Sequence, residues 1–392
     1  MKAVPFPVET EAAKIEFIDL VAQRHRLGDR IDAAIRRVMD SGRFIMGPEV
    51  VELERALSSF CGAQHVVTCS SGTDALMLCL RAKGVRAGDA VFLPSFTFAA
   101  TAEVVCRIGA TPVFVDSLPD TFNLDPESLR QGIATASREG LRPTAVIAVD
   151  LFGQPADYDS LTPVIAENQL WLLDDAAQSF GANYRGRHIG ALAHLTATSF
   201  YPSKPLGCYG DGGAVFTQDP ELAELLVSLR MHGKGREKYE HSRIGMNARL
   251  DTLQAAVLLE KLRIFPEELQ ARNRIARRYN ELLQDMVAVP RLIAGVSSVW
   301  AQYAILTPHR DQVASDLGSL GVPTAIHYPT PLHRQAPYQR CPIAGNGLPV
   351  ADRLSAEVLS LPMHPYLDEA TQDRIVDAVR DAVGRRTARA AQ

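Results

Sequence analysis

Short apolar runs alternate with segments of helical spacing through the first two thirds of this 392-residue chain. Runs rich in Val, Ala, Leu and Phe predict strands at 65–69, 90–93, 111–115, 145–149, 170–173, 196–201 and 213–217. Segments 74–82 and 97–108 lie between such runs and predict helices. Strands and helices in alternation, with both sheet faces covered, predict an α/β fold with a mainly parallel central sheet.

The pattern changes after the last of these strands. Apolar residues recur at helical spacing from Leu250 to Leu262, with Asp251 as the expected cap and Pro266 as the expected interruption. A further helix is expected at 272–283. Because 392 residues are too many for one ordinary core, we expect an N-terminal segment at 1–25, a large domain at 26–265 and a smaller C-terminal domain at 266–392.

Composition narrows the class of protein. Hydrophobic residues make up 46% and charged residues 22%, which is typical of a soluble globular protein. The net charge of -4 provides no field that would recruit nucleic acid or an anionic membrane. No run is long enough to span a membrane, and residues 1–11 lack the apolar core of a signal peptide. The six cysteines are scattered without metal-ligand spacing, so we expect a cytoplasmic protein with no metal site.

Lys204 is the first candidate for chemistry. It stands between Pro202 and Pro205, after a β-rich run and before four glycines, so it cannot lie in a regular helix. Its amine is therefore expected on a shaped loop. About thirty residues earlier, Asp175 ends a buried apolar strand. Pyridoxal phosphate (PLP) requires such an amine for its Schiff base and such a carboxylate for its protonated ring nitrogen.

Two further segments follow strands and suit the same cofactor. Residues 70–76 form a small-residue turn that opens a helix at Thr73 and Asp74, and free N–H groups at such a turn bind phosphate. Phe96 and Phe98 follow the next strand, where an aromatic side chain can stack on a flat ring or pack in the core. The polar loop 231–251 is rich in cations, so it either binds an anionic ligand or is a mobile basic loop.

Together these segments resemble the DegT/DnrJ/EryC1/StrS sugar aminotransferases, a family of fold-type-I PLP enzymes. The resemblance covers nearly the whole chain, and its motifs occur in the family's order. They are SGTDAL at 71–76, PSFTF at 94–98, PVFVD at 112–116, DAAQS at 175–179, PSK at 202–204, GDGGA at 210–214 and GMNARLD at 245–251.

The resemblance implies a role for each matching position. Lys204 would form the Schiff base and move protons, and Asp175 would pair with the ring nitrogen. The remaining cofactor contacts would be Gly72, Thr73, Phe98, Gln178, Ser199 and Asn247. Asn247 would reach the cofactor phosphate of the neighbouring subunit, which makes a homodimer with shared sites the minimum active unit. Asp174 and Tyr201 depart from the residues that are usual in the family, Glu and Phe.

Within the family, the segments at 202–213, 249–256, 327–329 and 360–366 look most like members that act on UDP-2-acetamido-2-deoxy-3-oxo-D-glucuronate. That substrate implies glutamate as amino donor and a role in bacterial surface polysaccharide, such as O-antigen. It carries a diphosphate and a carboxylate, which guanidinium groups match well. The predicted substrate contacts are Arg243, Arg249, His327 and Tyr328. His327 is as readily a structural histidine on the sequence alone.

Three other functions stay open at this point. The first is the same chemistry on a dTDP- or GDP-linked 4-keto- or 3-keto-6-deoxyhexose. The second is a PLP sugar dehydratase, although known members of that branch carry His where this chain has Lys204. The third is a non-enzymatic regulator with the same fold, and the presence of Lys204, Asp175 and Gln178 argues against it because a pure binder needs no electron sink.

Overall fold

The computed structural model describes residues 14–237 and 239–390, so the expectation about a signal peptide at 1–11 lies outside the described residues. Its centre is a seven-stranded sheet in the order β1-β9-β8-β5-β4-β2-β3. These strands are β1 (His65–Cys69), β2 (Asp89–Pro94), β3 (Thr111–Val115), β4 (Arg142–Val149), β5 (Trp171–Asp175), β8 (Leu195–Ser199) and β9 (Gly213–Thr217). All seven predicted strands are confirmed, with ends shifted by at most three residues.

The sheet is mainly parallel, as predicted. Strands β3, β2, β4, β5 and β8 pair in parallel, while β9 runs antiparallel to both β8 and β1. Strand β1 therefore points the same way as the parallel set. The carboxyl ends of six strands meet at one edge of the sheet, which is where ligands bind in open α/β sheets.

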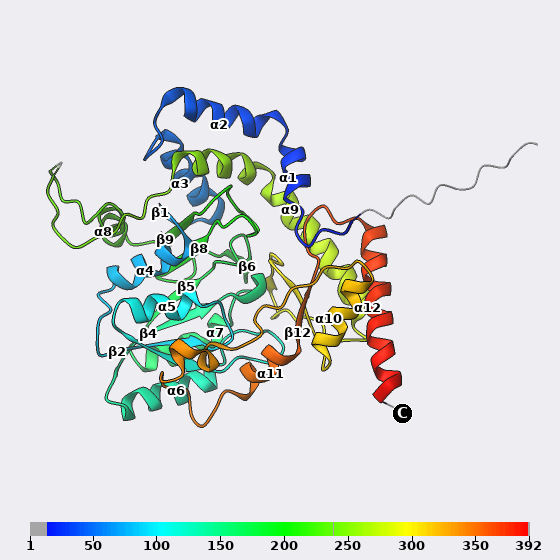
Figure 1. The fold of residues 1–392 in the computed structure, drawn as a ribbon. Coiled ribbons are helices and arrows are strands. Elements are labelled where there is room, and N and C mark those ends of the chain that lie inside the picture. The colour runs from blue at the N-terminus through cyan, green and yellow to red at the C-terminus, as the bar shows by residue number, and fades with distance from the viewer. Residues whose placement is uncertain (1–13, 238, 391–392) are drawn as a thin grey trace, which may run out of the picture.

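Helices enclose this sheet in two layers (Figure 1). One layer contains α4 (Gly72–Ala82), α5 (Ala100–Arg107) and α8 (Pro220–Arg230), with α4 beside the other two. In the other, α6 (Pro126–Arg138) lies beside α7 (Tyr158–Glu167). The helix expected at 97–108 begins only at Ala100, so Thr97 and Phe98 belong to the loop after β2. The short helix η1 (Leu151–Gly153) follows β4.

The long helix α9 (Thr252–Leu283) joins the two parts of the molecule (Figure 1). The expected interruption at Pro266 is wrong, because α9 continues through it. A proline removes one backbone hydrogen bond, but packing on both sides of this position holds the helix together. The first half packs on α2 (Asp29–Ser41) and α3 (Pro48–Cys61), with α1 (Leu20–Leu27) before them, and the second half packs on α12 (Glu369–Ala390). Asp251 is the residue at the cap, but its side chain makes no capping bond to the described residues.

A second core surrounds the distal half of α9. It contains β11 (Tyr303–Leu306) paired with β12 (Val358–Leu361), helix α10 (Arg310–Ser319), and α12, with Tyr279 and Tyr303 fully buried. A separate small sheet contains β6 (Asn183–Tyr184), β7 (Arg187–His188) and β10 (Val296–Ser297). The predicted domain boundary at 265/266 falls inside α9, and it stays a prediction.

The chain returns to the large sheet between β11 and β12. The segment with η2 (Leu332–Arg334), η3 (Ala336–Tyr338) and α11 (Pro349–Glu357) packs on the ends of β2 and β3. Phe114 N–H donates to Pro342 O at 3.0 Å, and Ala344 N–H donates to Phe114 O at 2.8 Å. This segment therefore connects the C-terminal part of the chain to the edge of the large sheet. No helix among the described residues is long and apolar enough to cross a membrane.

Candidate active site

A cavity of about 520 Å³ opens at the carboxyl edge of the large sheet. Its walls come mostly from the loops that follow β1, β2, β5 and β8, and from the segment before β12. The lining residues are Ser71, Gly72, Thr73, Leu76, Thr97, Phe98, Ala100, Thr101, Val149, Asp175, Ala177, Gln178, Ser199, Tyr201, Ser203, Lys204, Asp211, Gln302, His327 and Tyr328. The strand order therefore gathers into one cavity most of the residues that the sequence analysis selected.

Lys204 lies in this cavity on the loop between β8 and β9, as its flanking prolines predict. Its backbone N–H donates to Tyr201 O at 2.8 Å, which closes a tight turn. The side chain is half-buried. Burial lowers the pKa of the Lys204 ammonium from its usual value, and the negative charge of Asp175 opposes this shift. A lysine with a lowered pKa can act as a nucleophile and a base near neutral pH.

Asp175 is the last residue of β5 and is buried. Its Oδ2 accepts a hydrogen bond of 2.9 Å from Thr101 Oγ1, and its Oδ1 accepts one of 3.3 Å from Ala177 N–H. Burial raises the pKa of the Asp175 carboxyl, while these two bonds and the charge of Lys204 lower it. The preceding Asp174 points to the opposite face of the sheet, where its Oδ2 accepts from Thr196 Oγ1 at 3.1 Å.

The turn after β1 and the end of β8 approach one another closely. Ser71 caps α4 because its Oγ accepts a 3.0 Å hydrogen bond from Asp74 N–H. A Cβ added to Gly72 would lie 2.6 Å from Ser199 Cβ, so only glycine fits here without movement. Gly72, Thr73 and Ser199 all line the cavity at this point. Such a helix N-terminus binds a phosphate group.

The opposite wall is formed by aromatic and amide side chains. Gln178 Oε1 accepts from Phe152 N–H at 2.7 Å, and Gln178 Nε2 donates to the Tyr328 hydroxyl at 3.2 Å. The ring of Phe98 is 57% exposed in the cavity, with its centroid 6.1 Å from that of Tyr328. Gln178 and Tyr328 therefore support each other, and Phe98 leaves a face open to a flat ring.

His327 is positioned by the second core. Its Nδ1 is 3.1 Å from Ser360 Oγ, a residue of β12. Burial lowers the pKa of the His327 imidazole, and the positive charge of Lys204 lowers it further. His327 is therefore a neutral hydrogen-bonding group in the cavity wall near pH 7.

Three predicted site residues do not line this cavity. Arg249 Nη2 donates to Asn247 Oδ1 at 2.7 Å, and Arg243 Nη1 donates to Ser228 Oγ at 2.6 Å. All three lie on the segment between α8 and α9, apart from the cavity of their own chain. Their roles stay predictions, and the roles of Asn247 and Arg249 depend on a second subunit.

Thr101 and Gln302 are two polar residues of the cavity that the sequence analysis did not select. Thr101 lies inside α5, where nothing local distinguishes it from other helix residues. Gln302 comes just before β11, more than 90 residues after Lys204, so only the folded chain brings it to the site. No group of three or more His, Cys, Asp or Glu side chains in the described part of the chain is placed to hold a metal ion.

The arrangement fits PLP. A half-buried amine, a buried strand-end carboxylate, a helix N-terminus for phosphate and an exposed aromatic face all open into one cavity. The close approach of Gly72 to Ser199 leaves the backbone of this turn uncovered by a side chain. Few other ligands require this combination.

Comparison with known proteins gives the same result. A sequence model of the DegT/DnrJ/EryC1/StrS aminotransferase family matches residues 25–380. A UDP-2-acetamido-2-deoxy-3-oxo-D-glucuronate aminotransferase from Pseudomonas aeruginosa is 47% identical over 361 residues, which are 91% of this chain and 97% of that protein. A dTDP-3-amino-3,4,6-trideoxy-alpha-D-glucose transaminase from Streptomyces venezuelae is 40% identical over 373 residues, 95% of this chain and 97% of that protein.

Solved structures agree on the fold and the cofactor. The crystal structure of a DegT DnrJ EryC1 StrS aminotransferase from Brucella abortus is 52% identical, with a TM-score of 0.93 over 94% of this chain and 100% of that one. Other similar structures contain the cofactor in its PMP form or its PLP form. The chain belongs to the DegT/DnrJ/EryC1/StrS aminotransferase family and is a PLP-dependent aminotransferase.

Proposed function

We propose that this enzyme transfers the amino group of glutamate to the keto carbon of UDP-2-acetamido-2-deoxy-3-oxo-D-glucuronate, with Lys204 and Asp175 as its catalytic residues. The observation that carries the proposal is the pairing of a half-buried amine with a buried strand-end carboxylate in one cavity. The choice of sugar rests on the 47% identity to an aminotransferase with that substrate.

In this proposal the predicted site residues hold the cofactor, move a proton and keep the cofactor ring protonated. Bound PLP supplies a carbonyl that reacts with amines and a ring that takes up electrons from the bond being broken. Lys204 Nζ holds the cofactor, and in its neutral form it takes a proton from the α-carbon of the amino donor. Asp175 stays ionised and keeps the ring nitrogen protonated. Gly72, Thr73 and Ser199 bind the phosphate, while Phe98 and Gln178 lie against the ring.

One cavity serves the amino donor and the keto-sugar in turn, so we expect ping-pong kinetics. The sugar substrate carries a diphosphate and a carboxylate, whereas the keto-hexoses of related enzymes lack the carboxylate. We infer that His327 and Tyr328 contact the sugar from within the same chain. Arg243 and Arg249 would bind its anionic groups with two parallel hydrogen bonds each.

We also propose a homodimer whose subunits complete each other's sites. Asn247 and Arg249 lie outside the cavity of their own chain, on the segment between α8 and α9. Around the cavity and this segment, large apolar side chains are exposed in the single chain. They are Phe44, Ile45, Phe98, Tyr201, Tyr209 and Ile244. A second copy of the chain would cover such a surface.

The cellular setting follows from this substrate. We propose a cytoplasmic enzyme that supplies a 3-amino uronate to bacterial surface polysaccharide such as O-antigen. All six cysteines are free, which suits a reducing compartment.

The test is a panel of nucleotide-linked keto-sugars, each made in situ by its upstream oxidase or dehydratase, with glutamate as donor and product masses as the readout. The panel includes UDP-2-acetamido-2-deoxy-3-oxo-D-glucuronate, the matching UDP-linked keto-sugar without the carboxylate, and a dTDP-linked 4-keto-6-deoxyhexose. We expect amination of the uronate, and none with the Lys204→Ala variant. Preferential amination of the dTDP-sugar would overturn the substrate assignment and favour the second candidate function, which the 40% identical relative supports.

A further inference from the structure

Ser95, at the carboxyl end of β2, is hydrogen-bonded to the segment that returns from the C-terminal part of the chain. Its Oγ is 2.7 Å from His333 Nδ1 and accepts from His333 N–H at 3.2 Å. Its carbonyl oxygen accepts from Leu332 N–H at 2.9 Å, and its own N–H donates to Val115 O at 3.0 Å. Both Ser95 and His333 are buried. Ser95 is therefore joined by two hydrogen bonds to His333, 238 positions away in the sequence, and by one to the neighbouring Leu332.

These contacts fit a neutral His333 whose ring proton lies on Nε2. The Ser95 hydroxyl has one proton, and its oxygen already accepts the His333 amide proton. Donating that hydroxyl proton to His333 Nδ1 satisfies the Ser95 hydroxyl and leaves the ring proton on Nε2, which makes no hydrogen bond to the described residues. His333 Nε2 lies 3.4 Å from Asp352 Oδ1. A protonated imidazole would carry a second proton on Nδ1, so the Ser95 oxygen would have to accept that proton and its own hydroxyl proton would lose its acceptor.

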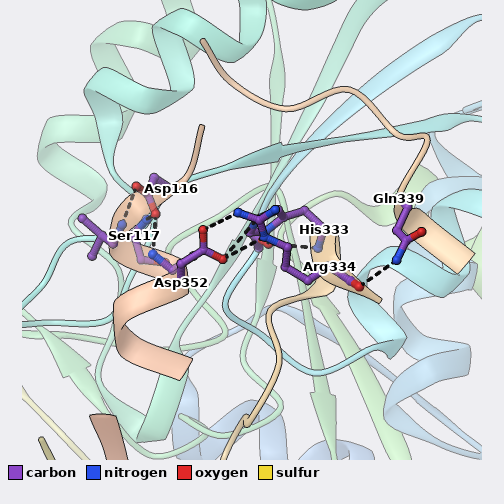
Figure 2. A network of polar contacts seen from close by, with 9 residues as sticks. Asp116, Ser117, His333, Arg334, Gln339 and Asp352 are labelled. Carbon is purple, nitrogen blue, oxygen red and sulfur yellow. Dashed lines mark hydrogen bonds and ion pairs between the residues drawn. The ribbon is translucent and has the colours of Figure 1, made fainter. Parts of the chain in front are cut away.

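Charged groups from three elements face the outer side of His333 (Figure 2). Asp352, on α11, accepts two hydrogen bonds from Arg334, at 3.1 and 2.7 Å. Asp116, after β3, holds the start of α11 because its carboxylate accepts from Val350 N–H at 3.0 Å and Ala351 N–H at 2.7 Å. Burial lowers the pKa of His333, Asp352 and Asp116 oppose this shift, and Arg334 adds to it.

On its other side, Ser95 leads directly into the wall of the cofactor cavity. We call residues 95–101 the cavity-wall segment. Phe96 is fully buried with its ring edge-on to Tyr328 at 6.3 Å, and Phe98 lines the cavity. At the end of the segment, Thr101 donates to Asp175 Oδ2. Ser95 therefore begins the segment that carries Phe98 and Thr101 to the cavity.

We propose that His333 is a positioning residue for the aminotransferase reaction. Through its bonds to Ser95 it holds the cavity-wall segment, and with it Phe98 and Thr101, against the bound cofactor. Asp352, whose helix α11 is held at its start by the Asp116 cap, orients the His333 ring from behind. The proposal rests on the proposed placement of PLP in this cavity, and it is independent of which sugar is aminated.

A simple structural clasp is the competing explanation, and matched variants separate the two. His333→Asn keeps a hydrogen-bond acceptor near the position of Nδ1, so it retains the bond to Ser95. His333→Gln places its amide near the position of Nε2 and loses that bond. Ser95→Ala removes the bond from the other side. Arg334→Gln breaks only the exposed outer pair and serves as the control.

The readouts are PLP affinity, the circular dichroism of bound PLP in the visible range, kcat, and melting temperature. Loss of a neutral hydrogen bond should weaken PLP binding and lower kcat by about three- to tenfold in His333→Gln and Ser95→Ala. His333→Asn and Arg334→Gln should stay close to wild type. PLP affinity of the wild type should also fall at acid pH as His333 takes up a proton, and His333→Asn should lack that component.

Two outcomes would overturn the proposal. In the first, His333→Gln and Ser95→Ala lower the melting temperature while PLP affinity, dichroism and kcat stay at wild-type values. In the second, His333→Asn is as impaired as His333→Gln in PLP affinity and kcat. A wild-type protein that bound no PLP would overturn the cofactor assignment together with this inference, so the two failures are distinguishable.

Discussion

Thr101 Oγ1 donates a 2.9 Å hydrogen bond to Asp175 Oδ2, which joins the first helix after β2 to the carboxylate at the end of β5. Thr101 is 1% exposed and Asp175 5% exposed, so water cannot replace this bond easily. The bond lowers the pKa of Asp175 against the effect of burial. Thr101 therefore helps to keep Asp175 ionised, and Asp175 is the residue that we assign to the ring nitrogen of PLP.

Thr101→Val should slow the reaction without changing the shape of the site. A hydrogen bond to a charged group contributes about 1.5–3 kcal/mol, which corresponds to about ten- to a hundredfold in kcat. Because the pKa of Asp175 would rise, the acid side of the pH–rate profile should move to higher pH. Steady-state kinetics from pH 5 to 9 test this. An unchanged profile in Thr101→Val would show that Asp175 does not depend on this bond.

Lys204→Ala should abolish transamination and leave the fold intact. Lys204 Nζ is the only amine that we place in the cavity, and no buried core cluster among the described residues includes this side chain. Lys204→Arg is the matched control, because it keeps a cation but cannot supply a neutral amine. Both variants should lose the visible absorbance of lysine-bound PLP while their far-ultraviolet dichroism stays normal. Substantial steady-state turnover by either variant would contradict the assignment.

The adjacent carboxylates of β5 should behave differently on substitution. Asp175→Asn should cost two or more orders of magnitude in kcat, because breaking a buried charge pair costs about 3–5 kcal/mol. Asp174→Asn should affect kcat far less, since Asp174 faces away from the cavity toward Thr196. If Asp174→Asn were the more damaging change, the register assigned to this strand would be wrong.

The burial of Asp174 leads us to expect that the free energy of unfolding depends on pH. Asp174 is fully buried, and burial followed by the charge of Asp150 raises its pKa well above the usual value. The folded state binds the Asp174 proton more tightly than the unfolded state, in which the pKa is about 3.9. The contribution of this proton to the free energy of unfolding is therefore fully present below about pH 3.9. It is lost as the pH rises toward the folded-state pKa. Asn has no proton to lose, so Asp174→Asn should gain stability relative to wild type from pH 4 upward. Urea unfolding at pH 4.5, 6 and 8 measures this difference, which would stay constant if Asp174 did not titrate.

The local sequence pattern was sufficient to predict the strands of the large sheet and several residues of the cavity, among them Asp175 and Lys204. Apolar runs bounded by polar or turn residues placed β1 and β3 at their observed ends, and Asp175 was predicted at the end of a strand because polar residues follow that run. Lys204 was found through its flanking prolines. These features depend on neighbours in the sequence, and parallel strands then bring their ends together.

The parts that the sequence did not reveal depend on distant packing. Thr101 has its role only because β2 and β5 lie in one sheet, and Gln302 reaches the cavity from the second core. The Ser95–His333 contact spans 238 residues, and neither residue has a local signal for it. Pro266 indicated a break in α9, because a proline removes a backbone hydrogen bond of its own helix. The packing that keeps α9 continuous comes from α2, α3 and α12, which are distant in the sequence.

Gly72→Ala should weaken PLP binding. The added Cβ would lie 2.6 Å from Ser199 Cβ, so the start of α4 would have to move away from β8 and spread the proposed phosphate site. The double variant Gly72→Ala/Ser199→Gly relieves the contact with Ser199 Cβ but also removes the Ser199 hydroxyl from the proposed phosphate site, so it should recover only part of the affinity. Gly318→Ala on α10 is the control, because nothing lies within 4 Å of its added Cβ, and it should stabilise the protein by about 0.5–1 kcal/mol. Equilibrium PLP titration checks all three, and normal PLP affinity in Gly72→Ala would place the phosphate elsewhere.

Arg249 tests whether two subunits share each site. It lies outside the cavity of its own chain, hydrogen-bonded to Asn247, so we expect it to act in the cavity of a second copy. Lys204→Ala and Arg249→Ala should each be impaired as homodimers. If Arg249 serves the opposite cavity, a mixed dimer has one cavity with both defects and one cavity with neither.

Mixing the two variants should therefore restore part of the activity. In a homodimer with closed twofold symmetry, random exchange of subunits gives about half mixed dimers. Each mixed dimer has one intact cavity out of two. The activity per subunit should therefore approach about a quarter of the wild-type value. Differently tagged subunits allow the mixed dimers to be isolated and verified. Recovery together with a raised KM for the keto-sugar and an unchanged KM for glutamate in Arg249→Ala would assign Arg249 to sugar binding across the interface. Verified mixed dimers without recovery would place Arg249 in the cavity of its own subunit or give it a purely structural role.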